Sequence, residues 1–282
     1  MRISKYLIAL AFGFISFSSS AWTIHADFDS GEIGTTADKG GDGFSGAGGG
    51  SLYSNEQAIN GNSAKLHIEE GKTGYGMWGG EFIFPEKVYR GEKLWYQVHV
   101  FFPENFDHYS YGEGNRLKFL RISTRSSEGK NHGYVDFLID KKEDPIPFKW
   151  IFEGENIWSN VGEPSDIIVK GQWESYQIQV TFDTVPLDSG GKAESKVWKN
   201  GVLLRHITNR KTMKENGDFS NRALLFTYWN GGAPKTQSMY VDEITITNET
   251  PDWTDAQGNP LIKNSLTSSN SPPSALVGLR IK

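Results

Sequence analysis

Short segments in which apolar and polar residues alternate follow one another along most of this chain, and turns rich in Gly, Pro and Asn separate them. Alternation with a period of two is typical of strands that bury one face, and no segment has the periodicity of an amphipathic helix. The clearest strand spans residues 94–102 and ends at Pro103, and Asn200-Gly201 marks a hairpin turn. The pattern predicts an all-β sandwich or jelly roll.

The beginning of the chain has the composition of a secretory signal peptide. Arg2 and Lys5 precede an apolar stretch, residues 6–17, which is too short to remain in a bilayer, and cleavage is predicted near Ala21. We therefore expect a secreted or periplasmic bacterial protein with no membrane association after cleavage. The predicted organisation is a signal peptide at 1–21, one jelly-roll domain at 22–250 and a tail rich in Ser, Asn and Pro at 251–282.

The composition narrows the class of partner. Because the chain has no cysteine, a secreted fold must be held by its core or by a metal rather than by disulfides. A net charge of -5 provides no basic surplus, so we expect no nucleic-acid partner. Most aromatic side chains should fill the core, but the loop residues Trp78 and Trp158 are predicted to contact sugar rings. We expect a monomer that binds an acidic polysaccharide.

One predicted strand, residues 115–124, carries cations on its open face. Arg116 and Lys118 point to one side of it, whereas Leu117 and Phe119 point to the other. Neighbouring cations repel each other unless an anion lies beside them. Two interpretations stay open: the anion is an acidic polysaccharide, or it is a set of carboxylates on neighbouring strands.

The residue types on the open strand faces suit β-elimination of a uronate. Such a lyase must neutralise the uronate carboxylate, remove the proton from C5 and protonate the leaving oxygen. We assign the base to His132 and the acid to Tyr228, with Tyr134 and Asn230 assisting. The predicted catalytic residues share an open face and the capacity to carry charge or a proton: Arg116, Lys118, His132, Tyr134, Tyr228 and Asn230.

These segments resemble the secreted bacterial polysaccharide lyases of the concanavalin A-like jelly-roll type, which include heparin-lyase-like and alginate-lyase-like groups. Residues 115–121 are similar to the arginine strand of those lyases, and residues 226–231 to their late tyrosine strand. Where alginate lyases have Gln-Ile-His, this chain has Gln177-Ile178-Gln179, and we take Gln177 and Gln179 as substrate-binding candidates. The resemblance covers residues 22–250 and implies a jelly roll that cleaves an acidic polysaccharide.

Carboxylates near the two ends of the domain predict a metal site. Asp27 and Asp29 belong to the first predicted strand and Asp242 to the last, and these strands are commonly neighbours in a jelly roll. Hard oxygen ligands suit Ca²⁺. The surrounding pattern also resembles carbohydrate-binding jelly rolls that hold a structural calcium there. The alternative is that these residues cap strand ends, and no organic cofactor is expected.

Other functions stay open at this point. The chain could be a non-catalytic carbohydrate-binding protein, a structural or adhesive protein, or a glycoside hydrolase. Asp136 and Asp140 are the nearest candidates for a hydrolase pair, since they lie four positions apart on one strand face. A lyase leaves a double bond in its product, whereas a hydrolase does not.

Overall fold

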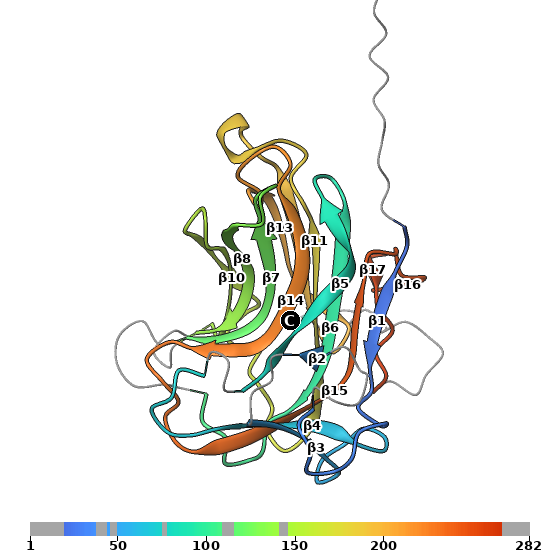
Figure 1. The fold of residues 1–282 in the computed structure, drawn as a ribbon, viewed down its shortest axis with the longest axis vertical. Coiled ribbons are helices and arrows are strands. Elements are labelled where there is room, and N and C mark those ends of the chain that lie inside the picture. Colours follow the sequence, from blue (N-terminus) through green and yellow to red (C-terminus); the bar gives the residue numbers. More distant parts are fainter. Residues whose placement is uncertain are drawn as a thin grey trace, which may run out of the picture.

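The computed structural model describes residues 20–37, 44–45, 50–74, 78–108, 116–140 and 146–266, and their regular structure is almost entirely β-strand (Figure 1). Within these ranges, no helix has the length and the apolar character needed to span a membrane. The predicted signal peptide lies outside the described residues, apart from its last two positions. The strands are β1 (Thr23–Ala26), β2 (Phe44–Ser45), β3 (Ser51–Ser54), β4 (Ser63–Ile68), β5 (Gly80–Tyr89), β6 (Lys93–Phe101), β7 (Leu117–Arg125), β8 (Asn131–Ile139), β9 (Phe148–Phe152), β10 (Ile157–Val161), β11 (Trp173–Thr181), β12 (Ala193–Lys199), β13 (Val202–Arg210), β14 (Phe219–Trp229), β15 (Gln237–Thr247), β16 (Trp253–Thr254) and β17 (Pro260–Leu261).

Two large antiparallel sheets form the fold. Sheet A has the strand order β13-β12-β11-β6-β15-β4-β3, with β1 also paired to β15, and sheet B has the order β10-β9-β8-β7-β14-β5-β2. The chain passes from sheet B to sheet A four times, after β2, β5, β10 and β14. The predicted jelly-roll sandwich is confirmed, and Figure 1 shows β7, β8 and β14 curving side by side in sheet B.

Aromatic rings join the two sheets. Phe119 on β7 stacks on Phe226 of β14 with ring centroids 4.5 Å apart, and it meets Tyr176 of β11, in sheet A, edge-on at 4.9 Å. All three side chains are fully buried. Each such pair adds about 0.5–1.5 kcal/mol beyond the burial of its area, so the aromatic content of the sequence serves mainly this core.

Two bulges in sheet B decide which side chains face outward. The register between β7 and β8 shifts between Lys118 and Leu120, and the register between β14 and β7 shifts between Leu225 and Tyr228. Because a bulge inserts one residue, it resets the alternation beyond it. Arg121 therefore faces the same side as Lys118, although a regular strand would place them on opposite faces.

The folded part of the chain continues past the predicted boundary at residue 250. Residues 253–264, here called the C-terminal strap, lie over the outer face of sheet A. The indole nitrogen of Trp95 donates to the Pro260 carbonyl at 3.1 Å, and that of Trp198 donates to Asp255 at 2.8 Å. The strap thus shields two tryptophans that would otherwise face water.

Replacing Asp255 with Ala should weaken the fold. Its carboxylate accepts hydrogen bonds from Trp198 and from the backbone of Gln257 and Asn259. Burial by itself would raise the pKa of Asp255, but these hydrogen bonds outweigh burial and lower the pKa. The stability that Asp255 contributes is therefore present at neutral pH and is lost as the pH falls through the lowered pKa.

We expect Asp255→Ala to lower the free energy of unfolding by about 1–3 kcal/mol at neutral pH, and by less in acid. Urea unfolding at both pH values measures this difference. The exposed Asp252 provides the matched control, since Asp252→Ala should change stability by less than about 0.5 kcal/mol. Equal stabilities of the two variants would contradict the prediction.

Candidate active site on the outer face of sheet B

Four charged side chains form a compact group on the outer face of sheet B. Lys118 and Arg121 come from β7, Asp136 comes from β8, and Glu153 directly follows β9. Lys118 Nζ lies 2.6 Å from Asp136 and 3.0 Å from Glu153, and Arg121 lies 2.8 Å from each of the same two carboxylates. We call these four residues the central ion cluster. The anions beside Lys118 are thus carboxylates of neighbouring strands, which was the second of the two interpretations of the cations on this strand.

The two carboxylates of the central ion cluster differ in proton affinity. Burial would raise the pKa of Asp136, but Arg121 and Lys118 outweigh it and lower the pKa. Burial and the neighbouring charge of Asp136 raise the pKa of Glu153. Asp136 therefore stays ionised while Glu153 is the first of the pair to take up a proton, and Asp136 does not suit the role of a general acid in a glycoside hydrolase.

A second set of ionic contacts lies beside the central ion cluster. Arg116 Nε donates to Asp140 at 3.0 Å, and Lys149 of β9 lies 3.7 Å from the other oxygen of the same carboxylate. The Arg116 guanidinium carbon lies 4.3 Å from the ring centroid of Trp158 on β10, which is 40% exposed. Among the described residues, Arg116 and Lys149 share this one carboxylate.

Tyr228 lies next to these charges on the same face. It pairs with Lys118 across β14 and β7, so the two side chains point to the same side of the sheet, whereas Trp229 is buried in the core. Within the part of the chain that the structure describes, the Tyr228 hydroxyl has no hydrogen-bond partner. The Asn230 backbone donates to the Arg116 carbonyl at 2.9 Å, which sets Asn230 beside the start of β7.

His132 lies at the other end of this sheet, contrary to the assignment as base. Its Nδ1 is 3.0 Å from the buried carboxylate of Asp218, in the loop before β14. The neighbouring Gly133 pairs with Thr124, six positions along β7 from Lys118, the partner of Tyr228. At about 3.3 Å per residue the two sites are about 20 Å apart, too far to act on one sugar unit.

Tyr134 does lie on the outer face of sheet B, although not beside Tyr228. Its ring packs on the Arg121 guanidinium, with 3.9 Å from the guanidinium carbon to the ring centroid. The hydroxyl accepts a hydrogen bond from Asn131 at 3.3 Å. Tyr134 therefore helps to hold Arg121 in the central ion cluster.

Three predicted substrate-binding residues are not accessible. Trp78 is fully buried and stacks on Trp229 of the core, with ring centroids 5.8 Å apart. Gln177 and Gln179 lie on sheet A and are 2% and 3% exposed. The strap covers Gln177, whose side-chain oxygen accepts the backbone N–H of Ile262 at 3.0 Å. These three assignments are wrong.

Sequence reasoning missed Arg121, Glu153 and Lys149. The β7 bulge reverses the expected direction of Arg121, and no pattern in the sequence marks a bulge there. Glu153 and Lys149 flank a five-residue strand whose partners are set by the sheet order. The signal that could have prompted a search for Glu153 is the set of cations in residues 115–124, since cations on a strand require carboxylates on its neighbours.

The predicted metal ligands lie near the β1–β15 pair, but among the described residues the oxygens of Asp27, Asp29 and Asp242 do not all lie within 4.8 Å of one another. Ala26 pairs with Ile244, and Asp29 is near enough to Asp242 to contribute to its raised pKa. Asp242 is 1% exposed, accepts backbone N–H groups from Ile59 and Glu243 at 2.8 Å each, and has no Lys or Arg partner among the described residues. Burial, with smaller contributions from Glu243 and Asp29, raises its pKa to about 7. A buried carboxylate without a basic partner fits a cation.

Another group, His132, Glu215 and Asp218, is close enough to hold a metal ion, since its ligand atoms all lie within 4.8 Å of one another. One oxygen of Asp218 already accepts the backbone N–H groups of Lys214 and Glu215 as well as facing His132. The Arg90 guanidinium donates to the Glu215 carbonyl at 2.6 Å, which places a positive charge close by. This arrangement suits a structural turn better than a cation site.

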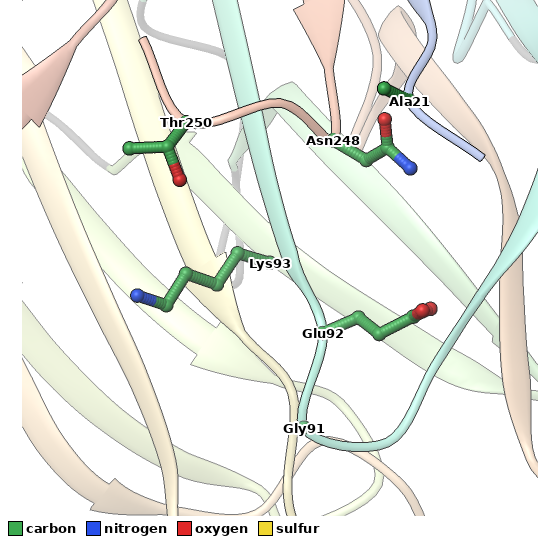
Figure 2. A pocket seen from close by; sticks show the side chains of 6 residues that line it. All are labelled: Ala21, Gly91, Glu92, Lys93, Asn248 and Thr250. Carbon is green, nitrogen blue, oxygen red and sulfur yellow. The ribbon is translucent and has the colours of Figure 1, made fainter. Parts of the chain in front are cut away.

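An open pocket of about 380 Å³ lies away from the outer face of sheet B (Figure 2). Its walls come from the β5–β6 turn and from the chain on either side of the β1–β15 pair, and in Figure 2 Glu92 and Lys93 extend in opposite directions. The lining residues are Ala21, Gly91, Glu92, Lys93, Asn248 and Thr250. None of them belongs to β7, β8 or β14, so the pocket is separate from the charged face.

No protein-family model matches this chain, and no curated protein matches its sequence. Solved structures do match it in fold. The marine PL-14 alginate lyase from Aplysia kurodai has a TM-score of 0.56 at 11% identity, with 81% of this chain and 99% of that lyase covered. An endo-β-1,4-glucuronan lyase from the fungus Trichoderma reesei has a TM-score of 0.52 at 11% identity, with 85% and 97% covered. This chain shares their fold.

A third neighbour is a mutant of alginate lyase Aly36B in complex with an alginate trisaccharide. Its TM-score is 0.54 at 12% identity, and the match covers 79% of this chain and 97% of that lyase. The predicted resemblance to jelly-roll polysaccharide lyases is thereby confirmed at the level of the fold. At such low identity, the chemistry of this chain has to be argued from its own residues.

Proposed function

We propose that this protein is a secreted polysaccharide lyase that cleaves a uronate-containing polysaccharide by β-elimination on the outer face of sheet B. The observation that carries the proposal is the placement of Tyr228 beside Lys118, with Arg116 and Asn230 at the adjoining strand ends. A tyrosine with an unengaged hydroxyl next to cations and an amide is the set of groups that the reaction needs. The shared fold with alginate and glucuronan lyases supports it.

In the proposed reaction Tyr228 carries the proton for both steps. The Asn230 amide and the positive charge that the central ion cluster carries when Glu153 is protonated stabilise the carboxylate as negative charge develops at C5. Ionised Tyr228 takes the C5 proton, the C4–O bond breaks as a C4–C5 double bond forms, and the phenol then protonates the leaving oxygen. The tyrosine ends in its starting state, so the step needs no other proton carrier and no role for His132.

The proposal is tested by incubating the mature protein with alginate, glucuronan, heparin, pectate and ulvan. The expected result is ultraviolet absorbance from an unsaturated product with at least one of these polymers. Retention on the polymer without product would identify a binding protein instead, and new reducing ends without a double bond would identify a hydrolase. Either outcome would overturn the lyase.

We also propose that Asp27, Asp29 and Asp242 hold a structural calcium ion. The metal would draw the three carboxylates together, neutralise the buried carboxylate of Asp242 and tie the first strand to the last. At calcium about 100 times its dissociation constant, the free energy of unfolding should rise by about 2.7 kcal/mol, and a chelator should reverse the gain. Thermal unfolding with calcium and with chelator measures this effect.

The control for calcium is Asp242→Asn, which keeps the shape of the side chain but removes its charge. The midpoint of thermal unfolding of this variant should not respond to calcium. An equal calcium response in the variant and the natural chain, or no response in either, would contradict the proposed site.

The raised pKa of Glu153 predicts a pH dependence of polymer binding. With Glu153 ionised the central ion cluster has no net charge, whereas with Glu153 protonated the cluster carries one positive charge. Affinity for a polyuronate should therefore fall, by about 3- to 10-fold, as the pH rises through the raised pKa of Glu153. Calorimetric titration between about pH 4.5 and about pH 7.5, where the polymer stays ionised, measures the change. Glu153→Gln should remove it, and the same pH profile in that variant would refute this origin.

A further inference from the structure

The Arg116 side chain is held in place by groups from two other strands. Its Nε donates to Asp140, at the end of β8, and its guanidinium lies over the ring of Trp158 on β10. Both supports are themselves fixed, because Asp140 is 4% exposed and the Trp158 indole nitrogen donates to Asn156 at 3.2 Å. The guanidinium is thus drawn away from Tyr228 on β14 and toward β10.

Arg116 differs from Lys118 and Arg121 in having hydrogen-bond donors that no described residue engages. Within the described ranges, its two terminal nitrogens have no hydrogen-bond acceptor. Its side chain is 27% exposed, whereas those of Lys118 and Arg121 are 9% and 7% exposed and donate to Asp136 and Glu153. Arg116 therefore presents a planar pair of N–H donors to the solvent.

This geometry fits a carboxylate in one particular position. A guanidinium binds a carboxylate through two parallel hydrogen bonds, and Arg116 shares the single charge of Asp140 with Lys149. Asp140, which Arg116 Nε contacts, directly follows β8, and β8 is two strands away from β14 in the sheet at about 4.8 Å per strand. A carboxylate on Arg116 would thus belong to a different sugar unit from the one that reacts at Tyr228.

We propose that Arg116 binds the carboxylate of a uronate unit adjacent to the reacting one, and that Asp140 and Trp158 are positioning residues for its guanidinium. The designation of the reacting unit rests on the proposed function. The inference specifies the substrate class further: an oligomer with consecutive uronates that lies across the strands from β14 toward β10. It also gives Trp158 a role in holding Arg116 rather than in stacking on a sugar.

The test measures binding and turnover of saturated hexamers of mannuronate and of glucuronate, together with the neutral hexamers made by reducing their carboxylates. Binding is measured by calorimetry in the Tyr228→Phe background. Arg116→Gln should weaken binding of a uronate hexamer by about 10- to 100-fold and raise KM with little change in kcat. The neutral hexamers should show no such loss. Arg116→Lys should recover only part of the affinity, because an ammonium does not reproduce the planar pair of donors.

The positioning residues have their own variants. Asp140→Asn and Trp158→Ala should each raise KM for the uronate hexamer by about 3- to 10-fold while Arg116 is still present. Lys130→Gln provides the control for charge, since Lys130 is 75% exposed and pairs with Glu128 near the far end of the sheet; it should change affinity by less than about 2-fold. Unfolding midpoints close to that of the natural chain confirm that each variant is folded.

The outcomes separate this inference from the proposed function. If Arg116→Gln behaves like Lys130→Gln, or weakens neutral and uronate hexamers equally, the Arg116 site is refuted while lyase activity can stand. If Arg116→Gln loses uronate affinity but no polymer yields an unsaturated product, the site stands and the lyase proposal fails. Failure of every uronate hexamer to bind overturns the inference.

Discussion

Replacing Tyr228 with Phe is expected to lower kcat on the preferred uronate polymer by about 10³- to 10⁴-fold. The proposed reaction assigns both proton transfers to the Tyr228 hydroxyl, and a positioned general acid–base group contributes about 10²- to 10⁴-fold by itself. The ring stays in place on β14, so binding of saturated oligomers should change little. Initial rates of ultraviolet absorbance, with calorimetric binding alongside, measure the two effects separately.

Tyr134 is the matched control, since it is a tyrosine of the same outer face that packs on Arg121 rather than lying beside Lys118. Tyr134→Phe should keep kcat within about 10-fold of the natural chain. A Tyr228→Phe variant with more than about a tenth of the original kcat would exclude Tyr228 as the proton carrier. The β-elimination itself would still be detected by its product.

Replacing Asp136 with Ala is expected to lower the free energy of unfolding by about 3–5 kcal/mol. Asp136 is fully buried and is the shared partner of Lys118 and Arg121. Removing one member of a buried ion pair leaves an uncompensated charge, which destabilises a fold by this amount. Urea unfolding followed by tryptophan fluorescence measures the loss.

The comparison for this prediction is Glu153→Gln. Glu153 contacts the same two cations, but its side chain is 33% exposed, so water can take over its role. We expect a loss of about 1 kcal/mol or less for this variant. If Asp136→Ala cost no more than Glu153→Gln, the central ion cluster would not be what holds the outer face of sheet B together.

The strands could be predicted from the sequence because apolar and polar residues alternate along a strand that buries one face. Residues 94–102 alternate over their whole length, and the structure has β6 at Lys93–Phe101. The neighbourhood of Asp29 and Asp242 was also predictable, because it follows from the pairing of the first and last strands. Arg116 and Lys118 were placed on one face because they alternate with Leu117, whereas the bulge between Leu225 and Tyr228 decides that Tyr228 faces the same side.

The wrong assignments share a physical cause, which is contact between segments far apart in the chain. Trp78 looked like a loop residue open to sugar, yet stacking on Trp229 buries it. Gln177 looked open on its strand, yet a segment 85 residues later covers it. A local sequence pattern predicts which face of a strand is polar, but it does not predict which distant segment of the chain packs on that face.

By itself, the sequence determined the fold class, the strands and the identity of the charged groups, since alternation and turn residues act over a few neighbouring positions. Only the tertiary structure decided how those charges are paired. The bulge in β7 turns Arg121 outward, and the sheet order brings Asp136 and Glu153 against it. It also sets Arg116 against Asp140 and Trp158, because strands distant in sequence become neighbours only when the sheet forms.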